Sequence, residues 1–168
     1  MGNHDVTRLA SRLTNPDQLP LALAVLLTVG GTPSVYYGDE QAFRGVKEDR
    51  AGGDDAVRPS FPATPQNLAG AGWPVYYLHQ ELIGLRRRHA WLHTARSKVL
   101  TLSNEHLVYE ARTDTTAITV ALNLSGQPAQ LPIPPSAAAM LAGNGKTLPD
   151  RNAVNLPGHG WAVLGTAT

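Results

Sequence analysis

The sequence predicts an α/β segment followed by an all-β module, and three observations lead to that expectation. An apolar, helix-like stretch at residues 17–29 is followed at once by a short aromatic run at residues 32–38. A helix and a buried strand in this order form half of an α/β repeat. Beyond residue 92 the helical period disappears, and short segments of alternating polarity are separated by Gly, Pro and Asn turns. That pattern favours a small antiparallel sandwich, so we expect two domains, residues 1–92 and residues 93–168.

The first predicted helix begins near Asp17, whose side chain can cap its N-terminus. Pro20 is tolerated because it falls in the first turn, and Gly30 and Gly31 end the helix. Apolar residues occupy almost every position in between, so this helix should be buried on most of its sides. The run TPSVYYG, residues 32–38, then predicts a buried strand.

A second helix is predicted over residues 73–92, where Leu78, Leu82 and Leu85 recur at i, i+4 and i+7 on one face. The segment that precedes it, residues 41–72, is rich in Gly, Pro and charged residues. A loop of this length in a compact domain is usually functional or mobile.

The second half of the chain carries the strand patterns. Two stretches alternate in polarity with a period of two, HLVYEAR at residues 106–112 and AITVALNL at residues 117–124. Weaker strand patterns cover residues 98–102, 130–133, 138–141 and 153–156, and GWAVLG closes the series at residues 160–165. We expect these strands to pair antiparallel, because the turns between them are short.

The amino-acid composition is that of a globular protein with nearly balanced positive and negative charges. Of its 168 residues, 42% are apolar, and the formal net charge is +1. This balance indicates no nucleic-acid partner and no attraction to an anionic membrane surface. One basic cluster, Arg86 to Arg88, ends the second predicted helix. We favour the interpretation that these arginines lie in solvent and complement the helix dipole, rather than forming a binding patch.

The chain contains no cysteine, so disulfides and cysteine-ligated metal sites are excluded. Its longest apolar run, residues 21–29, is too short to span a bilayer. No basic start leads into an apolar run at the N-terminus, as a signal peptide would require. We expect a cytoplasmic protein with no membrane partner, and export stays open because the absence of cysteine suits the cytoplasm without forbidding it.

Four motifs occur in a fixed order along the chain. They are GNHD-x-T-R-L from residue 2, GTPSVYYGDE from residue 31, DDAVRPSFP from residue 54 and LIGLRRRHAWL from residue 82. This ordered set resembles the C-terminal part of the α-amylase family, glycoside hydrolase family 13. In that family an N-H-D motif ends the seventh barrel strand, the G-T-P-x-x-Y-Y-G-x-E motif forms the eighth, and a helix like residues 79–86 comes last. The resemblance implies the C-terminal fragment of a (β/α)8 TIM barrel followed by an antiparallel β-sandwich, domain C.

The resemblance also implies roles for the first motif. Asp5 matches the third family carboxylate, which grips ring hydroxyls and favours the oxocarbenium-like transition state, and His4 matches a histidine that binds sugar hydroxyls. Hydrogen bonds to a sugar hydroxyl that strengthen in the transition state lower the barrier by several kcal/mol. Asn3 either orients this pair through its amide or simply forms a turn. Arg8 lies close enough in sequence to pair with a carboxylate of the site.

Other polar and aromatic residues near the motifs have less specific interpretations. The eighth strand closes with Asp39 and Glu40, and for Tyr36 and Tyr37 we favour packing over stacking on a sugar. Asp54, Asp55 and Arg58 are expected to form a loop ion-pair cluster. We reject Asp54 and Asp55 as a general acid/base pair, because adjacent loop residues rarely face one substrate from opposite sides.

The resemblance places the other catalytic groups upstream. A retaining glycosidase needs a nucleophile and an acid about 5–5.5 Å apart, and in the family these carboxylates and the calcium-binding loops precede the motifs found here. We therefore expect a portion of a glycosidase or transglycosylase for α-glucosidic bonds that is inactive alone. It would hold no metal or cofactor, use an α-glucan or small α-glucoside, and need the remainder of the barrel in cis. Without that remainder, residues 1–70 should be loosely ordered and the first helix should lose its cover.

Two alternatives belong to other classes. The sandwich can be an autonomous carbohydrate-binding or structural module with a vestigial barrel stub, which exposed aromatic residues would favour. Trp91 and Trp161 only flank the module, and Tyr109 is expected in its core. A metal-binding HD-type phosphohydrolase would need further His and Asp ligands, and the remaining histidines lack metal-ligand spacing.

Overall fold

The computed structural model describes residues 2–148 and 152–166, which belong to two compact units. One unit comprises Met1–Leu19 and Pro33–Gln80, and we call it the motif unit because it contains the first three sequence motifs almost entirely. The other comprises Pro20–Thr32 and Glu81–Thr168, and we call it the sheet unit. The boundary expected at residues 92 and 93 between barrel and sandwich domains stays a prediction.

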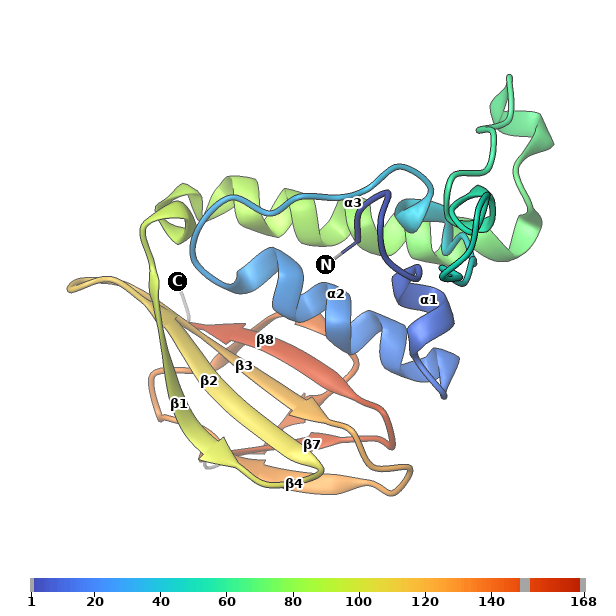
Figure 1. Ribbon diagram of the computed structural model, residues 1–168. Coiled ribbons are helices and arrows are strands. Elements are labelled where there is room, and N and C mark those ends of the chain that lie inside the picture. The colour runs from blue at the N-terminus through green and yellow to red at the C-terminus, as the bar shows by residue number, and fades with distance from the viewer. Residues whose placement is uncertain (1, 149–151, 167–168) are drawn as a thin grey trace. The chain divides into compact units, whose positions relative to one another are not determined.

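Among its described residues, the sheet unit contains two antiparallel sheets (Figure 1). The larger sheet has five strands in the order β1-β2-β3-β8-β5, and the smaller has three in the order β4-β7-β6. The strands are β1 Arg96–Leu102, β2 His106–Arg112, β3 Ala117–Asn123, β4 Ala129–Pro132, β5 Ala139–Gly143, β6 Lys146–Thr147, β7 Ala153–Leu156 and β8 Trp161–Gly165. The predicted antiparallel module is confirmed. Of the strands in the described part of the chain only β6 was missed, because two residues are too few to show an alternation.

The central strands of the larger sheet are buried on both faces. On one face a core cluster fills the space between the two sheets, and it includes Val108, Ala121, Val154 and Leu164. Tyr109 follows Val108 on β2, points to the opposite face and is 3% exposed. A second layer must therefore cover the face that carries Tyr109.

Helix α2, Leu19–Thr28, supplies that layer (Figure 1). The hydroxyl oxygens of Thr28 and Tyr109 lie 2.5 Å apart, so the helix contacts β2 directly. Leu23 and Leu27 are each 1% exposed, which confirms the predicted burial. The expectation that this helix loses its cover is wrong, because the sheet face covers it.

The start of α2 differs from the prediction. A short 3-10 turn, Pro16–Gln18, precedes the helix, and Asp17 lies inside that turn. The side chain of Asn15 accepts a hydrogen bond from the Asp17 N–H at 2.9 Å. Asn15 therefore makes the cap that we had expected of Asp17, because the chain turns two residues earlier.

Replacing Tyr109 with phenylalanine should reduce the free energy of unfolding by about 1 kcal/mol. The Thr28 hydroxyl donates to the Ala24 carbonyl at 2.5 Å, so Tyr109 must be the donor to Thr28. Burial raises the pKa of Tyr109 to about 12, which keeps this donor protonated at neutral pH. Urea denaturation measures this loss of unfolding free energy. Tyr77→Phe is the control, because it removes the same hydroxyl from a tyrosine that is 60% exposed and should have little effect on stability. Equal stability of the two variants would contradict the role of this hydrogen bond.

Helix α3, Trp73–Arg88, confirms most of the second predicted helix, and a 3-10 turn, Ala90–His93, follows it. Within the sheet unit, the Arg86 guanidinium donates to the carbonyls of Leu27 and Val29 at 3.0 and 2.9 Å, and also to that of Gly31. These carbonyls lie at and just beyond the C-terminus of α2. The solvated role expected for this basic cluster is therefore wrong for Arg86, whose pKa is lowered by burial.

The motif unit is built from short elements and loops. Besides the first half of α3 it contains helix α1, Leu9–Arg12, and 3-10 turns at Asp39–Gln41, Asp55–Val57, Pro65–Asn67 and Gly70–Gly72. Over the described ranges 2–148 and 152–166, no helix is long and apolar enough to cross a membrane.

The strand predicted at residues 32–38 does not form. Within the described part of the chain, all strand pairing lies between Arg96 and Gly165. Val35 and Tyr37 are 37% and 38% exposed, so the segment is not buried either. A strand exists only where a neighbour pairs its backbone groups, and residues 32–38 have no such neighbour among residues 2–148 and 152–166.

Candidate functional site

The sequence motif GNHD forms a turn at the start of the motif unit. The side-chain oxygen of Asn3 accepts a hydrogen bond from the Asp5 N–H at 2.8 Å, which is an Asx turn. Of the two alternatives for Asn3, this geometry is that of the turn-forming residue. The side chains of His4 and Asp5 project from the turn and are 61% and 60% exposed. Both are therefore accessible to a ligand.

Arg58 holds Asp5 from a distant point in the sequence. Its Nη2 lies 3.0 Å from Asp5 Oδ1, and its Nε donates to the His4 carbonyl at 3.0 Å. The second Asp5 oxygen, Oδ2, lies 3.1 Å from His4 Nε2. One arginine thus binds both the carboxylate and the backbone of the His-Asp pair. This arrangement orients Asp5 while leaving it exposed to accept hydrogen bonds from hydroxyl groups.

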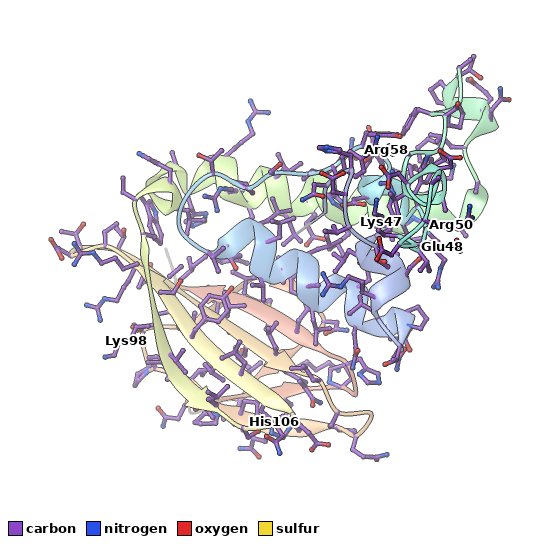
Figure 2. The ribbon with its side chains drawn as sticks, viewed as in Figure 1. Lys47, Glu48, Arg50, Arg58, Lys98 and His106 are labelled. Carbon is purple, nitrogen blue, oxygen red and sulfur yellow. The ribbon has the colours of Figure 1, made fainter. Side chains whose placement is uncertain are left out.

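Arg58 also belongs to the loop cluster predicted from the sequence (Figure 2). Its Nη2 lies 2.5 Å from Asp54 Oδ2, and Lys47 forms an ion pair with the other oxygen of Asp54. The predicted pairing of Asp54 with Arg58 is confirmed, whereas Asp55 makes no ion pair with any described residue and begins a 3-10 turn. Two cations neutralise Asp54, which makes it a poor nucleophile or general acid.

Arg8 is buried, with 1% of its surface exposed, and it does pair with a carboxylate. The partner is Asp39, whose Oδ1 lies 3.1 Å from Arg8 Nη1. The same nitrogen donates to the Tyr37 carbonyl at 2.6 Å. Arg8 therefore connects the His-Asp motif to the end of the GTPSVYYGDE motif, and it is not exposed to a ligand.

Aromatic rings enclose the Arg8 guanidinium. Its central carbon lies 4.4 Å from the ring centroid of Tyr36, 5.0 Å from that of Tyr37 and 5.8 Å from that of Phe43. Cation–π attraction of this kind stabilises a desolvated guanidinium. The Tyr37 hydroxyl donates to the Pro59 carbonyl at 2.8 Å. These contacts agree with the packing role that we favoured for the two tyrosines.

Burial raises the pKa of the Asp39 carboxyl, and the hydrogen bond and positive charge of Arg8 offset this rise only in part. Between the ordinary aspartate pKa and the raised value, the folded chain binds more protons than the unfolded chain. The stability contributed by this group therefore falls as the pH rises through that window. We expect the stability difference between wild type and Asp39→Asn to change as the pH rises above the ordinary aspartate pKa of about 4. Unfolding free energies in that range measure it, and a constant difference would contradict the raised pKa.

Sequence reasoning missed two partnerships in this site. Arg58 was assigned to a loop cluster without its contact to Asp5, and Asp39 was not recognised as the partner of Arg8. The pairs are separated by 53 and 31 residues, so no local spacing reveals them. The only signal was compositional, since each arginine occurs in a motif that also carries carboxylates.

The described residues contain no group of three or more His, Cys, Asp or Glu side chains that could hold a metal ion. The chemistry that the His-Asp turn offers includes hydrogen bonding by His4 and hydrogen-bond acceptance by the oriented Asp5 carboxylate.

Comparisons with known proteins identify the relatives of this chain. Residues 1–97 match the family described as alpha amylase, catalytic domain. The chain is 31% identical over 123 residues to a cyclomaltodextrin glucanotransferase of Geobacillus stearothermophilus, covering 73% of this chain and 16% of that protein. It is 26% identical to a 4-alpha-glucanotransferase of Thermotoga maritima, covering 74% of this chain and 34% of the relative. The chain thus spans about a third or less of these relatives.

A debranching enzyme of Nostoc punctiforme has a similar structure, with a TM-score of 0.75 and 23% identity, and the likeness covers 98% of this chain and 32% of that one. At this identity the likeness shows the fold, which is the C-terminal end of a (β/α)8 barrel followed by an antiparallel β-sandwich. The family match covers more than half of the residues and includes the entire His-Asp turn. The chain therefore belongs to the α-amylase family, glycoside hydrolase family 13.

Proposed function

We propose that this chain supplies part of the active site of an enzyme that acts on α-glucosidic bonds by a retaining mechanism. Asp5 would stabilise the transition state, and His4 would bind a sugar hydroxyl. The observation that carries the proposal is the exposed Asp5 carboxylate, held by Arg58 at 3.0 Å and flanked by His4 at 3.1 Å. An ionised carboxylate held in this way accepts hydrogen bonds from ring hydroxyls, which strengthen as positive charge develops on the sugar.

The nucleophile and the general acid would come from residues outside this chain. A retaining mechanism requires two carboxyl groups about 5–5.5 Å apart, in addition to the carboxylate that stabilises the transition state. Asp54 contacts the same Arg58 nitrogen as Asp5 does, and it is neutralised by Arg58 and Lys47. Asp39 is paired with the buried Arg8. Neither is free to attack a sugar carbon, so the chain would be inactive by itself.

The substrate class follows from the relatives. Their names include glucanotransferases, an α-amylase and a debranching enzyme, which are enzymes of α-glucans. We extend to this chain only the shared bond type, the α-glucosidic bond.

A chimera tests the proposal. The matching C-terminal part of the Thermotoga maritima 4-alpha-glucanotransferase is replaced with this chain, and turnover of maltoheptaose is measured for the chimera and for the chain alone. We expect turnover by the chimera and none by the chain alone. Circular dichroism and thermal unfolding establish that the chimera is folded. Turnover by the chain alone, or a folded chimera without turnover, would overturn the proposal.

The size of the native polypeptide tests whether the rest of the barrel is present in cis. An antibody against residues 93–168 should detect a polypeptide far larger than the 17.9 kDa of this chain. Detection of a 17.9 kDa species alone would instead require that the remaining barrel be a separate polypeptide or that the sandwich act independently.

A further inference from the structure

A cavity of about 760 Å³ lies in the sheet unit, apart from the His-Asp turn in sequence and in contacts. It is lined by the turn that follows α3, by the β2–β3 turn at residues 113–116 and by parts of β5 and β8. All of its lining residues belong to the sheet unit, whereas His4 and Asp5 belong to the motif unit. Its volume is within the range of roughly 300–1,000 Å³ that is usual for small-molecule sites.

The charges that line this cavity balance one another. Arg88 and Arg112 contribute two positive charges, and Glu110 and Asp114 contribute two negative charges. Arg112 Nη1 lies 3.5 Å from Glu110 Oε2, and the Glu110 side chain is only 13% exposed. A phosphate would be attracted by the arginines and repelled by the carboxylates, and a metal cation the reverse, so the cavity favours neither ion. A neutral ligand is favoured, and it would find ionic donors and acceptors as well as the threonine hydroxyls of the turn.

Trp91 provides an apolar surface in the same cavity. Its ring is partly buried and packs edge-on against His89, with ring centroids 6.0 Å apart and an interplanar angle of 80°. His89 Nδ1 donates to the Leu85 carbonyl at 2.9 Å, which fixes the histidine ring. The Trp91 carbonyl accepts from both the N–H and the hydroxyl of Thr94, each at 3.1 Å. The Trp91 backbone is therefore fixed, and its ring packs against a histidine that is itself hydrogen-bonded, which lowers the entropic cost of binding.

We infer that this cavity is a second carbohydrate-binding site, which takes a short α-glucan with Trp91 as its stacking surface and the Glu110–Arg112 pair as its polar contact. A neutral polyhydroxylated ligand with an apolar ring face matches both the aromatic and the polar lining. The identity of the glucan rests on the proposed function. The site itself needs no residue of the His-Asp turn, so it binds without turning over its ligand.

The test titrates maltoheptaose into the 168-residue chain and measures binding by isothermal titration calorimetry, and the indole N–H signal of Trp91 in NMR spectra locates the ligand in every protein that keeps this residue. We expect a saturable shift, and binding roughly tenfold weaker in Trp91→Ala, which corresponds to about 1.4 kcal/mol. Ala117→Arg is the second variant, because Ala117 is an exposed lining residue where a long side chain fills the cavity without disturbing the core. It should abolish binding. Trp73→Ala and Asp49→Ala, both in the motif unit, should bind as wild type does, and cellohexaose should bind more weakly than maltoheptaose.

Three outcomes would overturn this second site. They are the absence of binding by the wild-type chain, unchanged binding by both Trp91→Ala and Ala117→Arg, and loss of binding in Asp5→Ala alone. The last outcome would place the glucan at the His-Asp turn and so support the proposed function. Conversely, a chimera without turnover leaves the binding test intact, because that test measures affinity in the sheet unit.

Discussion

Asp5→Asn should reduce the turnover of the chimera about a thousandfold, with a much smaller change in KM. Asparagine keeps the shape of the side chain and one acceptor oxygen, but it removes the negative charge that, in the proposed function, stabilises the developing oxocarbenium ion. It also replaces an oxygen with an amide nitrogen, which cannot accept from either Arg58 or a ring hydroxyl. Interactions made mainly in the transition state affect kcat, so the loss should appear there.

The measurement is steady-state hydrolysis or transfer with maltoheptaose, and Asp49→Asn is the matched control. Asp49 is an exposed aspartate of the same unit, so the control makes the same change in charge away from the turn. It should retain the turnover of the parent chimera. If Asp5→Asn raised KM tenfold or more and left kcat unchanged, Asp5 would bind ground state and transition state equally, and its assigned role would be wrong.

Arg8→Met should destabilise the motif unit by about 3 kcal/mol at neutral pH. The Asp39 side chain is 10% exposed, and its carboxylate would lose its only arginine partner among the described residues. Methionine approximates the length of the lost side chain, so the penalty comes mainly from an uncompensated buried charge. Burial already raises the pKa of Asp39, and removing Arg8 would raise it further. The destabilisation should therefore shrink as the pH falls and Asp39 becomes protonated.

Amide hydrogen exchange measures this effect within the unit. The Gly45 N–H donates to Ser11 Oγ at 2.9 Å and the Lys47 N–H to Thr7 Oγ1 at 3.0 Å, so both report opening of the segment around Arg8. Exchange at these two amides should become about a hundredfold faster in Arg8→Met.

Two further variants separate the buried charge from simple loss of an arginine. Adding Asp39→Asn to Arg8→Met should restore most of the protection, because it removes the unpaired charge. Arg50→Met removes a pair with Glu48 whose side chains are 66% and 52% exposed, and it should have an effect near zero. If Arg8→Met behaved like Arg50→Met, or if Asp39→Asn added to the damage, the buried pair would not have the role assigned to it.

The strands of the sheet unit could be predicted from the sequence because their signal is local. Side chains alternate between the two faces of a strand, so HLVYEAR and AITVALNL indicate strands without reference to any partner. The burial of the second face, at Val108, Thr119 and Ala121, depends on the other sheet and was not visible in this alternation. Helix α2 was predicted for a similar reason, because nearly all of its residues are apolar and none of its faces is polar. The cover of α2 was not predictable, because the sheet face that carries Tyr109 lies some 80 residues further along the chain.

The run at residues 32–38 shows the limit of a local signal. Its β-branched and aromatic residues have the composition of a buried strand, yet a strand requires a neighbour to pair its N–H and C=O groups. The structure offers none within the described ranges. The composition therefore indicated that this segment can form a strand, and the lack of a pairing partner among the described residues leaves it as a loop.

At the candidate site, the sequence by itself determined the motif and the family, because adjacent residues such as His4 and Asp5 carry a recognisable pattern. Only the tertiary structure decided which charges meet. It placed Arg58 on Asp5, Arg8 on Asp39 and Arg86 on the carbonyls that end α2. Arginine side chains are long and flexible, and each could satisfy several acceptors, so spacing along the chain does not select among them. Burial and the folded path of the backbone make that selection, and both exist only after the distant segments have been brought together.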